Sequence, residues 1–182
     1  MNRTRFLALL VQAFCGASIK FWYFNMGWPG ATNDITVYKQ TDVYRAATHN
    51  TIPDWVSFLL HEAYSSCGGH HLTPFSQHQL RRAFGVGTNT LYYQMRTFNH
   101  VLSSQRIIIE RAFGQLVRRS WILWCANSSR LENVSLVVLV CAKLHNLCVD
   151  RWVTNGKNSD NSINVKIIII MGNVKIFHPM MV

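Results

Sequence analysis

Two runs of bulky apolar and aromatic residues near the start of the chain constrain the fold most strongly. Residues 6–14 and 19–26 are rich in strand-forming residues, and Cys15-Gly-Ala-Ser18 between them is typical of a compact turn. We therefore expect an antiparallel hairpin at the start of the domain. Because 49% of the 182 residues are hydrophobic, one domain of this length can bury a sizeable core.

The pattern then changes from strands to helices. A short helical stretch, which Thr32-Asn33-Asp34 can cap, runs toward Ala47, and Trp55-Val-Ser-Phe-Leu-Leu60 predicts a third strand. Loops are expected at residues 65–75 and at Gly85-Val-Gly87. The order is strands first, then mixed elements, then helices.

Two long stretches have apolar residues at helical spacing, from about Asn89 to Ser120 and from Val134 to Val149. On a helical wheel with about 100° per residue, the residues around Glu110 fall on two faces. The apolar face holds Ile109, Ala112, Phe113, Leu116 and Ser120, and the basic residues Arg111, Arg118 and Arg119 lie away from it. Glu110 falls at the border of these faces, so we expect it at the rim of the core. The second stretch predicts a buried helix that includes Leu136, Val137, Val140, Cys141, Leu144 and Cys148.

The end of the chain differs in character. Residues 154–162 are polar, and Lys166-Ile-Ile-Ile-Ile-Met171 is a β-prone run with no neighbouring partner in the pattern. We expect a domain over residues 6–150 and an appended, poorly ordered tail over residues 151–182. An exposed isoleucine run of this kind favours aggregation.

The charge balance favours a polyanionic partner. Lys and Arg number 18 against 8 Asp and Glu, which gives a formal net charge of +10, and nucleic acid is the commonest polyanion. Basic residues cluster between residues 81 and 130 with aromatic residues among them. This cluster can follow a phosphate backbone, and the alternative is an exposed basic helix face.

The chain is expected inside the cell and outside membranes. Its start imitates a secretory signal, but Gln12 interrupts the apolar run and five cysteines leave one unpaired in a secreted protein. No apolar run approaches the roughly 20 residues of a membrane helix. Reduced core cysteines are the expectation at Cys15, Cys125, Cys141 and Cys148.

Carboxylates at the ends of predicted elements are the candidates for metal chemistry. Two-metal cleavage of nucleic acid needs clustered oxygen ligands, because Mg²⁺ prefers them. The candidates are Asp34 at a helix start, Glu62 after the third strand and Glu110 on the basic helix. Each has a structural alternative: Asp34 can cap its helix, Glu62 can be a solvated loop residue, and Glu110 can pair with a neighbouring arginine.

Histidines and cysteines offer weaker candidates. Cys67-Gly-Gly-His70-His71 resembles half of a zinc site, but no second ligand pair follows at matching spacing. His145 lies within an apolar helix, where a core histidine bonded to the backbone is the usual arrangement.

Five motifs, taken in order over residues 8–150, resemble the endonuclease domain of harbinger-type (PIF/Harbinger) transposases and the nucleases derived from them. They are Gly27-Trp-Pro-Gly-Ala-Thr-Asn-Asp34, Phe58-Leu-Leu-His-Glu-Ala-Tyr64, Leu72-Thr-Pro-Phe75, Ile109-Glu-Arg-Ala-Phe-Gly-Gln-Leu-Val-Arg-Arg119 and Val140-Cys-Ala-Lys-Leu-His-Asn146. The resemblance implies an α/β fold of the ribonuclease-H-like type, a mixed sheet flanked by helices. It also implies a DDE metal triad with Mg or Mn, DNA as partner, a possible Myb-like DNA-binding protein beside it, and a place in the nucleus or cytoplasm.

The triad carries over only in part. The family's first Asp lies on a strand that precedes the opening hairpin and normally occupies the sheet centre, so the chain is N-terminally truncated relative to the family and an unpaired edge is expected. The second Asp corresponds to His61, with Glu62 beside it, and the third acid is Glu110. Asp34 matches a characteristic Asp of a Pro-Gly-Ser-x-x-Asp motif and is expected to be structural or adjacent to the site.

Three hypotheses follow. The first is a truncated, degenerate DDE nuclease with Glu110 as catalytic acid, His61, Glu62 and Asp34 as further metal candidates, and DNA contacts from Arg106, Arg111, Arg118 and Arg119. The second is a catalytically inactive remnant that binds nucleic acid or protein. The third is an open reading frame of a transposon with no stable product. Whether the chain is an enzyme stays open at this point, because two of the three triad acids are missing.

Overall fold

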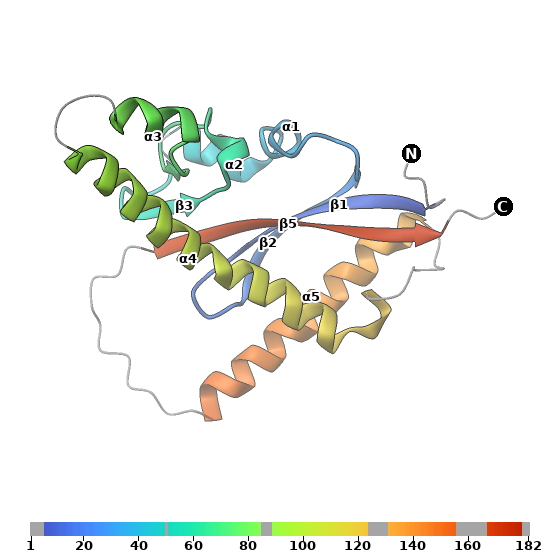
Figure 1. Ribbon diagram of the computed structural model, residues 1–182. Coiled ribbons are helices and arrows are strands. Elements are labelled where there is room, and N and C mark those ends of the chain that lie inside the picture. The colour runs from blue at the N-terminus through green and yellow to red at the C-terminus, as the bar shows by residue number, and fades with distance from the viewer. Residues whose placement is uncertain (1–5, 50, 85–88, 124–130, 156–166, 180–182) are drawn as a thin grey trace.

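The computed structural model describes residues 6–49, 51–84, 89–123, 131–155 and 167–179. In this part of the chain five strands form one mixed sheet, and helices cover both of its faces (Figure 1). The strand order is β2-β1-β5-β3-β4. The expected mixed α/β architecture is confirmed at this level.

The opening hairpin forms as the sequence predicts. Strand β1 (Phe6–Cys15) pairs antiparallel with β2 (Phe21–Pro29), and Ala13 lies opposite Phe24. The turn between them includes Ile19, whose φ of 59° lies in the left-handed region of the backbone that residues other than glycine rarely adopt. Alternation along β1 sends side chains to two separate cores, one on each face of the sheet.

The second half of the sheet is parallel. Strand β3 (Val56–Leu59) lies beside the short strand β4 (His71–Leu72), which falls where we expected only a loop. Backbone hydrogen bonds at the borders of this pair run from the N–H of Phe58 to the carbonyl of His70 and from the N–H of Leu60 to the carbonyl of Leu72, both 2.9 Å. A strand of two residues leaves no alternation in the sequence, so the pattern could not predict it.

Strand β5 (Ile167–Pro179) occupies the centre of the sheet. It runs antiparallel to β1, from the pair Phe6–Pro179 to the pair Cys15–Ile170, and parallel to β3, from Val56–Ile167 to Leu59–Ile170. This differs from the appended tail, and from the unpaired edge of β1, that the sequence predicted. The isoleucine run pairs with β3 and the rest of the strand pairs with β1, so β5 satisfies backbone groups along both edges. Residues 156–166 and 180–182 of the expected tail lie outside the described residues.

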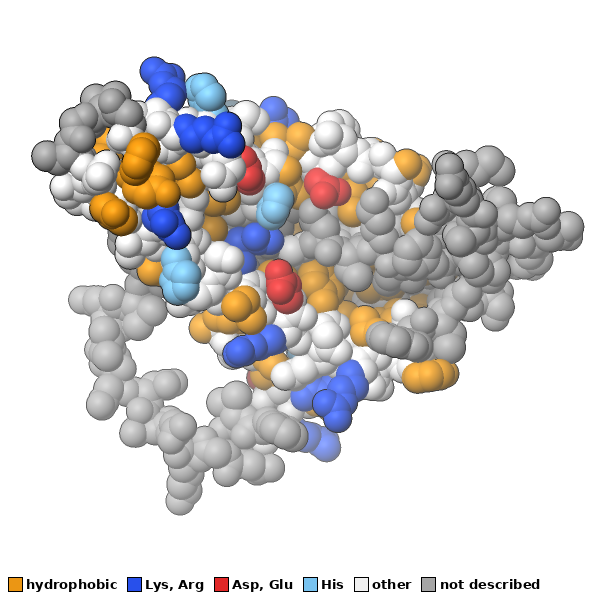
Figure 2. All heavy atoms as spheres, in the orientation of Figure 1, with side chains coloured by type: hydrophobic (Ala, Val, Ile, Leu, Met, Phe, Trp, Pro, Cys, Tyr) orange, Lys and Arg blue, Asp and Glu red, His pale blue; other side chains and the backbone are white. Residues whose placement is uncertain are grey.

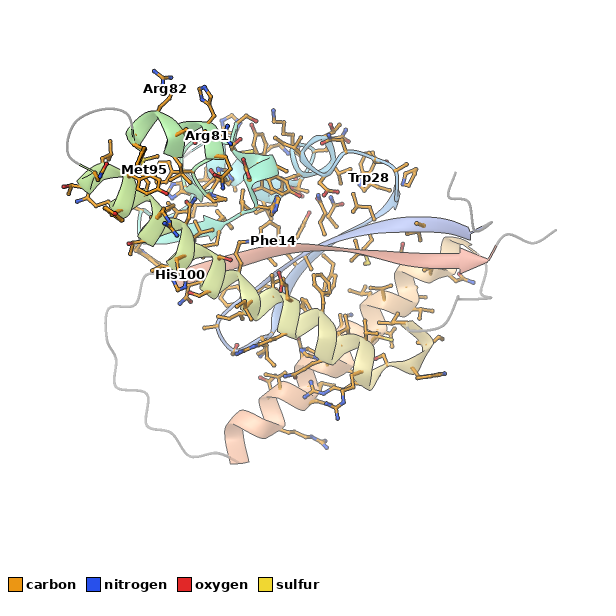
Figure 3. The ribbon with its side chains drawn as sticks, in the orientation of Figure 1. Phe14, Trp28, Arg81, Arg82, Met95 and His100 are labelled. Carbon is orange, nitrogen blue, oxygen red and sulfur yellow. The ribbon has the colours of Figure 1, made fainter. Side chains whose placement is uncertain are left out.

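Short helices cover one face of the sheet. They are α1 (Asp34–Tyr38), α2 (Asp42–Thr48) and the 3₁₀ turn η1 (Glu62–Tyr64), and α3 (Gln77–Phe84) follows them. Asn33 caps α1, since its side chain accepts a hydrogen bond from the N–H of Ile35 at 3.0 Å. Phe14 of β1 reaches the core under α1 (Figure 3), where its ring lies 6.0 Å from that of Tyr38.

Two long helices cover the opposite face. Helix α4 (Thr90–Arg119) leads through the short turn η2 (Trp121–Leu123) toward α5 (Leu131–Asn155). The predicted apolar face of α4 is confirmed, because Ile109, Ala112, Phe113 and Leu116 are all buried. The expected loop at Gly85-Val-Gly87 lies outside the described residues.

Helix α5 is apolar on two sides. Its inner side is buried and includes Val134, Val138, Cys141, Ala142, His145 and Val149. Leu136, Val140 and Leu144 are exposed, as is Cys148, whereas we expected all four inside the core. The stretch Asn133–Arg151 is long and apolar enough, by length and composition alone, to cross a membrane, although we expected no such run. Cys15 is buried as predicted, and Cys125 lies outside the described residues.

Candidate functional site

The sheet opens at the carboxyl end of β3. The last pair between β3 and β5 is Leu59–Ile170, whereas β5 continues along β1 to Pro179. Beyond Ile170, β5 has a neighbouring strand on one side only. Ligands of open α/β sheets bind outside the carboxyl ends of strands where neighbouring strands diverge. This opening is therefore the place where a binding or catalytic site is expected.

His61 and Glu62 follow directly from β3 into the opening. His61 is the N-cap of η1, and its Nδ1 accepts a hydrogen bond from the N–H of Ala63 at 3.3 Å. Both side chains are exposed. An Asp at this position could cap the same turn through its carboxylate, so the local fold does not depend on a histidine here.

Gln12 ties this end of the sheet to α1. Its side chain is fully buried, and Nε2 donates to the carbonyl of Asp34 at 2.8 Å and approaches the hydroxyl of Tyr64 at 3.3 Å. Gln12 Oε1 accepts from Nδ2 of Asn25 at 3.3 Å. Thus Asp34 and η1 lie on the same face of the sheet. The cap of α1 is Asn33, so the carboxylate of Asp34 sits in the first helical turn.

Sequence reasoning missed the positioning role of Gln12, although the signal was present. A single amide side chain stands within an otherwise apolar strand. A buried amide must find partners for both its donor and its acceptor, so such a residue marks a point where the core is polar. Here the polar point lies beside the opening at the end of β3.

Glu110 lies on the opposite face of the sheet. Along β5, its helix crosses at the height of the residues that follow β3, and we call this the same level of the sheet. Its neighbour Ile109 is fully buried against β5, because a Cβ placed on Gly172 would lie 2.6 Å from Ile109 Cγ1. Helix α4 therefore crosses β5 at Gly172, two positions beyond Ile170, where β3 has already ended. Glu110 itself is exposed, as expected for the border between the apolar and basic sides.

The described residues do not gather into a metal site. Asp34 and Glu62 lie on the face covered by α1 and α2, whereas Glu110 belongs to the helix on the other face. Within the described part of the chain, no three His, Cys, Asp or Glu side chains lie close enough to hold one ion. The sequence of β5 contains no Asp or Glu at all. This donor set does not fit a pair of Mg²⁺ ions, which need several oxygen ligands.

Arginines on α4 form the basic part of the site. Arg111 and Arg118 are exposed and seven residues apart, so they share one side of the helix. Arg106 is half-buried, and its Nε is buried without a hydrogen-bond partner among the described residues. On the face drawn in Figure 2, separate groups of basic side chains lie over α3 and α4, and Figure 3 shows Arg81 and Arg82 extending from α3.

Arg119 has a second role in the core. Its Nη1 lies 3.0 Å from Nδ1 of His145, and Nε2 of His145 lies 3.0 Å from the carbonyl of Ile19. Because a guanidinium only donates, Nδ1 accepts and Nε2–H donates to the carbonyl. Burial lowers the pKa of His145, a backbone hydrogen bond opposes this, and the nearby Arg119 charge adds to it. The prediction of a core histidine bonded to the backbone is confirmed.

The Cys67-x-x-His70-His71 segment is part of the core. Nδ1 of His71 donates to the carbonyl of Gly68, so Nε2 accepts from the hydroxyl of Tyr38 at 2.8 Å. His70 Nδ1 lies 3.0 Å from the carbonyl of Val56. Burial lowers the pKa of His71, and burial raises the pKa of the Cys67 thiol. These side chains are engaged in hydrogen bonds and packing rather than arranged as ligands.

Comparison with protein families places most of the chain in a known family. A family model described as DDE superfamily endonuclease matches residues 2–146. No curated protein matches the chain significantly, and neither does any solved structure. The matched range covers β1 through most of α5 and excludes β5.

Proposed function

We propose that this chain, which belongs to the DDE superfamily of endonucleases, is a harbinger-type, transposase-derived domain that binds DNA without cutting it. One observation carries the proposal. At the opening of the sheet, the residue after β3 that the resemblance matches to the family's second Asp is His61, and the central strand β5 contains no carboxylate. A family whose chemistry uses divalent metal is here left with Glu110 as the one matching acid.

Several features support DNA as the partner. Arg111 and Arg118 project from α4, and the chain carries a net charge of +10. Exposed arginines at one helical spacing can neutralise successive phosphates, which supplies affinity without sequence preference. A Myb-like DNA-binding protein as partner, residence in the nucleus or cytoplasm, and the ribonuclease-H-like type of the fold belong to the same proposal.

A second candidate function is cleavage by a reduced site. His61 and Glu62 are exposed at the end of β3, and Glu110 reaches the same level of the sheet. Imidazole suits softer ions better than it suits Mg²⁺. This alternative therefore predicts activity with Mn²⁺ in preference to Mg²⁺.

Cleavage of a supercoiled plasmid separates the two candidates. Purified protein is incubated with Mg²⁺, Mn²⁺ or EDTA, beside Glu110→Ala and His61→Asp variants. The proposed function predicts no nicking by the wild-type protein in any of the three conditions. Nicking that requires metal and disappears in Glu110→Ala would establish the reduced site instead. The His61→Asp variant reports whether a restored carboxylate is sufficient for cleavage.

DNA binding is tested by its dependence on salt. Arg111→Gln with Arg118→Gln should weaken binding to any duplex and make log K fall less steeply with log salt, by roughly one in slope for each phosphate that the variant no longer neutralises. Arg45→Gln on α2 is the matched control, because Arg45 is exposed and already paired with Asp42 at 2.6 Å. An equal reduction of affinity in the control and in the α4 variant would rule out α4 as the DNA-binding surface.

A further inference from the structure

Strand β5 joins two parts of the sheet that are otherwise separate. The antiparallel pair β2-β1 and the parallel pair β4-β3 are neighbours of β5 and not of each other. Without β5, the inner edges of β1 and β3 would each present a row of backbone donors and acceptors with no strand beside it. An extended strand satisfies both edges when it lies first beside β3 and then beside β1, and we call this place along the two edges the groove.

The two edges contact the strand one after the other. The edge of β3 pairs with Ile167–Ile170 and the edge of β1 from Phe6 to Cys15 pairs with Ile170–Pro179, so Ile170 is paired on both sides. On the β1 side, Leu10, Val11 and Ala13 are buried, so the edge belongs to the centre of the molecule. The main-chain hydrogen bonds of two edges and apolar neighbours on both faces are the features by which proteins bind a peptide as an added strand.

The groove also selects one residue type. Opposite Ala13, the strand must pass beneath α4, and a Cβ on Gly172 would lie 2.6 Å from Ile109 Cγ1 and 3.1 Å from Phe113 Cε2. Real Cβ atoms essentially never approach another atom as closely as 2.6 Å, so the buried Ile109 side chain or the strand itself would have to shift. Glycine inside a strand commonly marks a close approach of this kind. The groove therefore accepts an extended strand with a glycine at the crossing of α4.

From these observations we propose that the groove along the edges of β3 and β1 is a strand-binding site, and that β5 is its ligand, tethered to the same chain. The strand comes from the opposite end of the chain to β1 and lies beyond both long helices. Pairing between distant segments has the largest loop-closure cost, so β5 enters after the local hairpin and helices have formed. A peptide with the sequence of β5 can then take the same place.

The experiment uses the full chain with Gly172→Val, in which the tethered strand no longer fits under Ile109. Hydrogen exchange should show faster exchange of the β1 and β3 amides, while the amides of α5 stay protected. A peptide of residues 167–179 with added terminal lysines should bind this variant and restore protection in β1 and β3. The same peptide carrying Gly172→Val should not bind, and Gly114→Val on α4, where an added Cβ meets nothing within 4 Å, is the control for a β-branched residue at an open site.

Equal binding of both peptides, or no binding of the wild-type peptide to a folded Gly172→Val chain, would overturn the proposal. If Gly172→Val prevents folding altogether, a second variant tests the same point. A protease site introduced between Asn155 and Ile167 allows the folded full chain to be cut. Under the proposal the released segment stays with the body on gel filtration and exchanges with labelled peptide. Separation of the segment from a body that stays folded would contradict it.

Discussion

His71 and His145 are buried in the two cores, whereas His61 after β3 and Glu110 on α4 are exposed. Each buried histidine has hydrogen bonds at both ring nitrogens, which fixes its tautomer and its orientation. His61 caps a single turn, and Glu110 stands at the border of α4. The buried pair contributes to stability, and the exposed pair is where binding or chemistry must be sought.

Replacing His145 should have the largest effect on stability. His145→Ala removes a ring that is 1% exposed and leaves the carbonyl of Ile19 and the guanidinium of Arg119 without this partner. A cavity together with lost buried hydrogen bonds costs about 3 kcal/mol of the free energy of unfolding. Denaturant unfolding measures the change, with the exposed His78→Ala as control. A loss below about 1 kcal/mol, as for a surface residue, would contradict the structural role.

Tyr38→Phe should have a smaller effect in the other core. The change removes the hydroxyl that donates to Nε2 of His71 and keeps the ring packing against Phe14 and Tyr64. A buried acceptor left unsatisfied costs about 1–2 kcal/mol. Tyr93→Phe provides the control, because that side chain is 59% exposed. Equal midpoints for the two variants in urea would mean that the Tyr38–His71 bond adds nothing.

The pH dependence of stability should follow the same two histidines. Burial lowers the folded-state pKa of both His71 and His145 below the ordinary value of 6.5. As the pH falls through 6.5, the unfolded chain takes up protons first, so it binds more protons than the folded chain and folding is disfavoured. We expect the thermal midpoint to fall below about pH 6.5 in wild type and less steeply in His145→Gln. Identical pH profiles for the two proteins would remove His145 from this explanation.

The exposed pair should give the smallest effect. His61→Ala and Glu110→Ala are expected to change the free energy of unfolding by no more than about 0.5 kcal/mol, since neither side chain is buried. Thermal melts of both variants measure this before any plasmid assay. A decrease of about 2 kcal/mol or more in either would show a structural role that burial does not reveal, and the cleavage assay would then need a different control.

Much of the local structure could be predicted from the sequence. The spacing of apolar residues, the turn residues and the residue types predicted three features. These are the hairpin at residues 6–26, the apolar face of α4 with Ile109 and Phe113, and the core position of His145. These features depend on interactions within a few residues or on a single amphipathic pattern, which the sequence displays directly. The candidate site was predictable only as residues on separate elements.

Other features could not be predicted because they depend on neighbours far along the chain. The exposed outer side of α5, with Leu136 and Leu144, looks as apolar as its buried side in the sequence. The short strand β4 exists because β3 offers it an edge. The contact of Gln12 with the start of α1 could be predicted only by knowing that Asp34 and Tyr64 lie beside it.

By itself, the sequence determined the residues from which this protein is built: strand-forming runs, amphipathic helices, a basic helix face and only 8 Asp and Glu residues. The tertiary structure alone decided that Ile167–Pro179 fills the sheet centre and that Glu110 meets the level of His61 from the opposite face. The physical reason is the separation along the chain over which each kind of interaction acts. Propensity and periodicity act between near neighbours, whereas strand pairing joins segments from opposite ends of the chain and is settled only by the edges that the folded molecule leaves open.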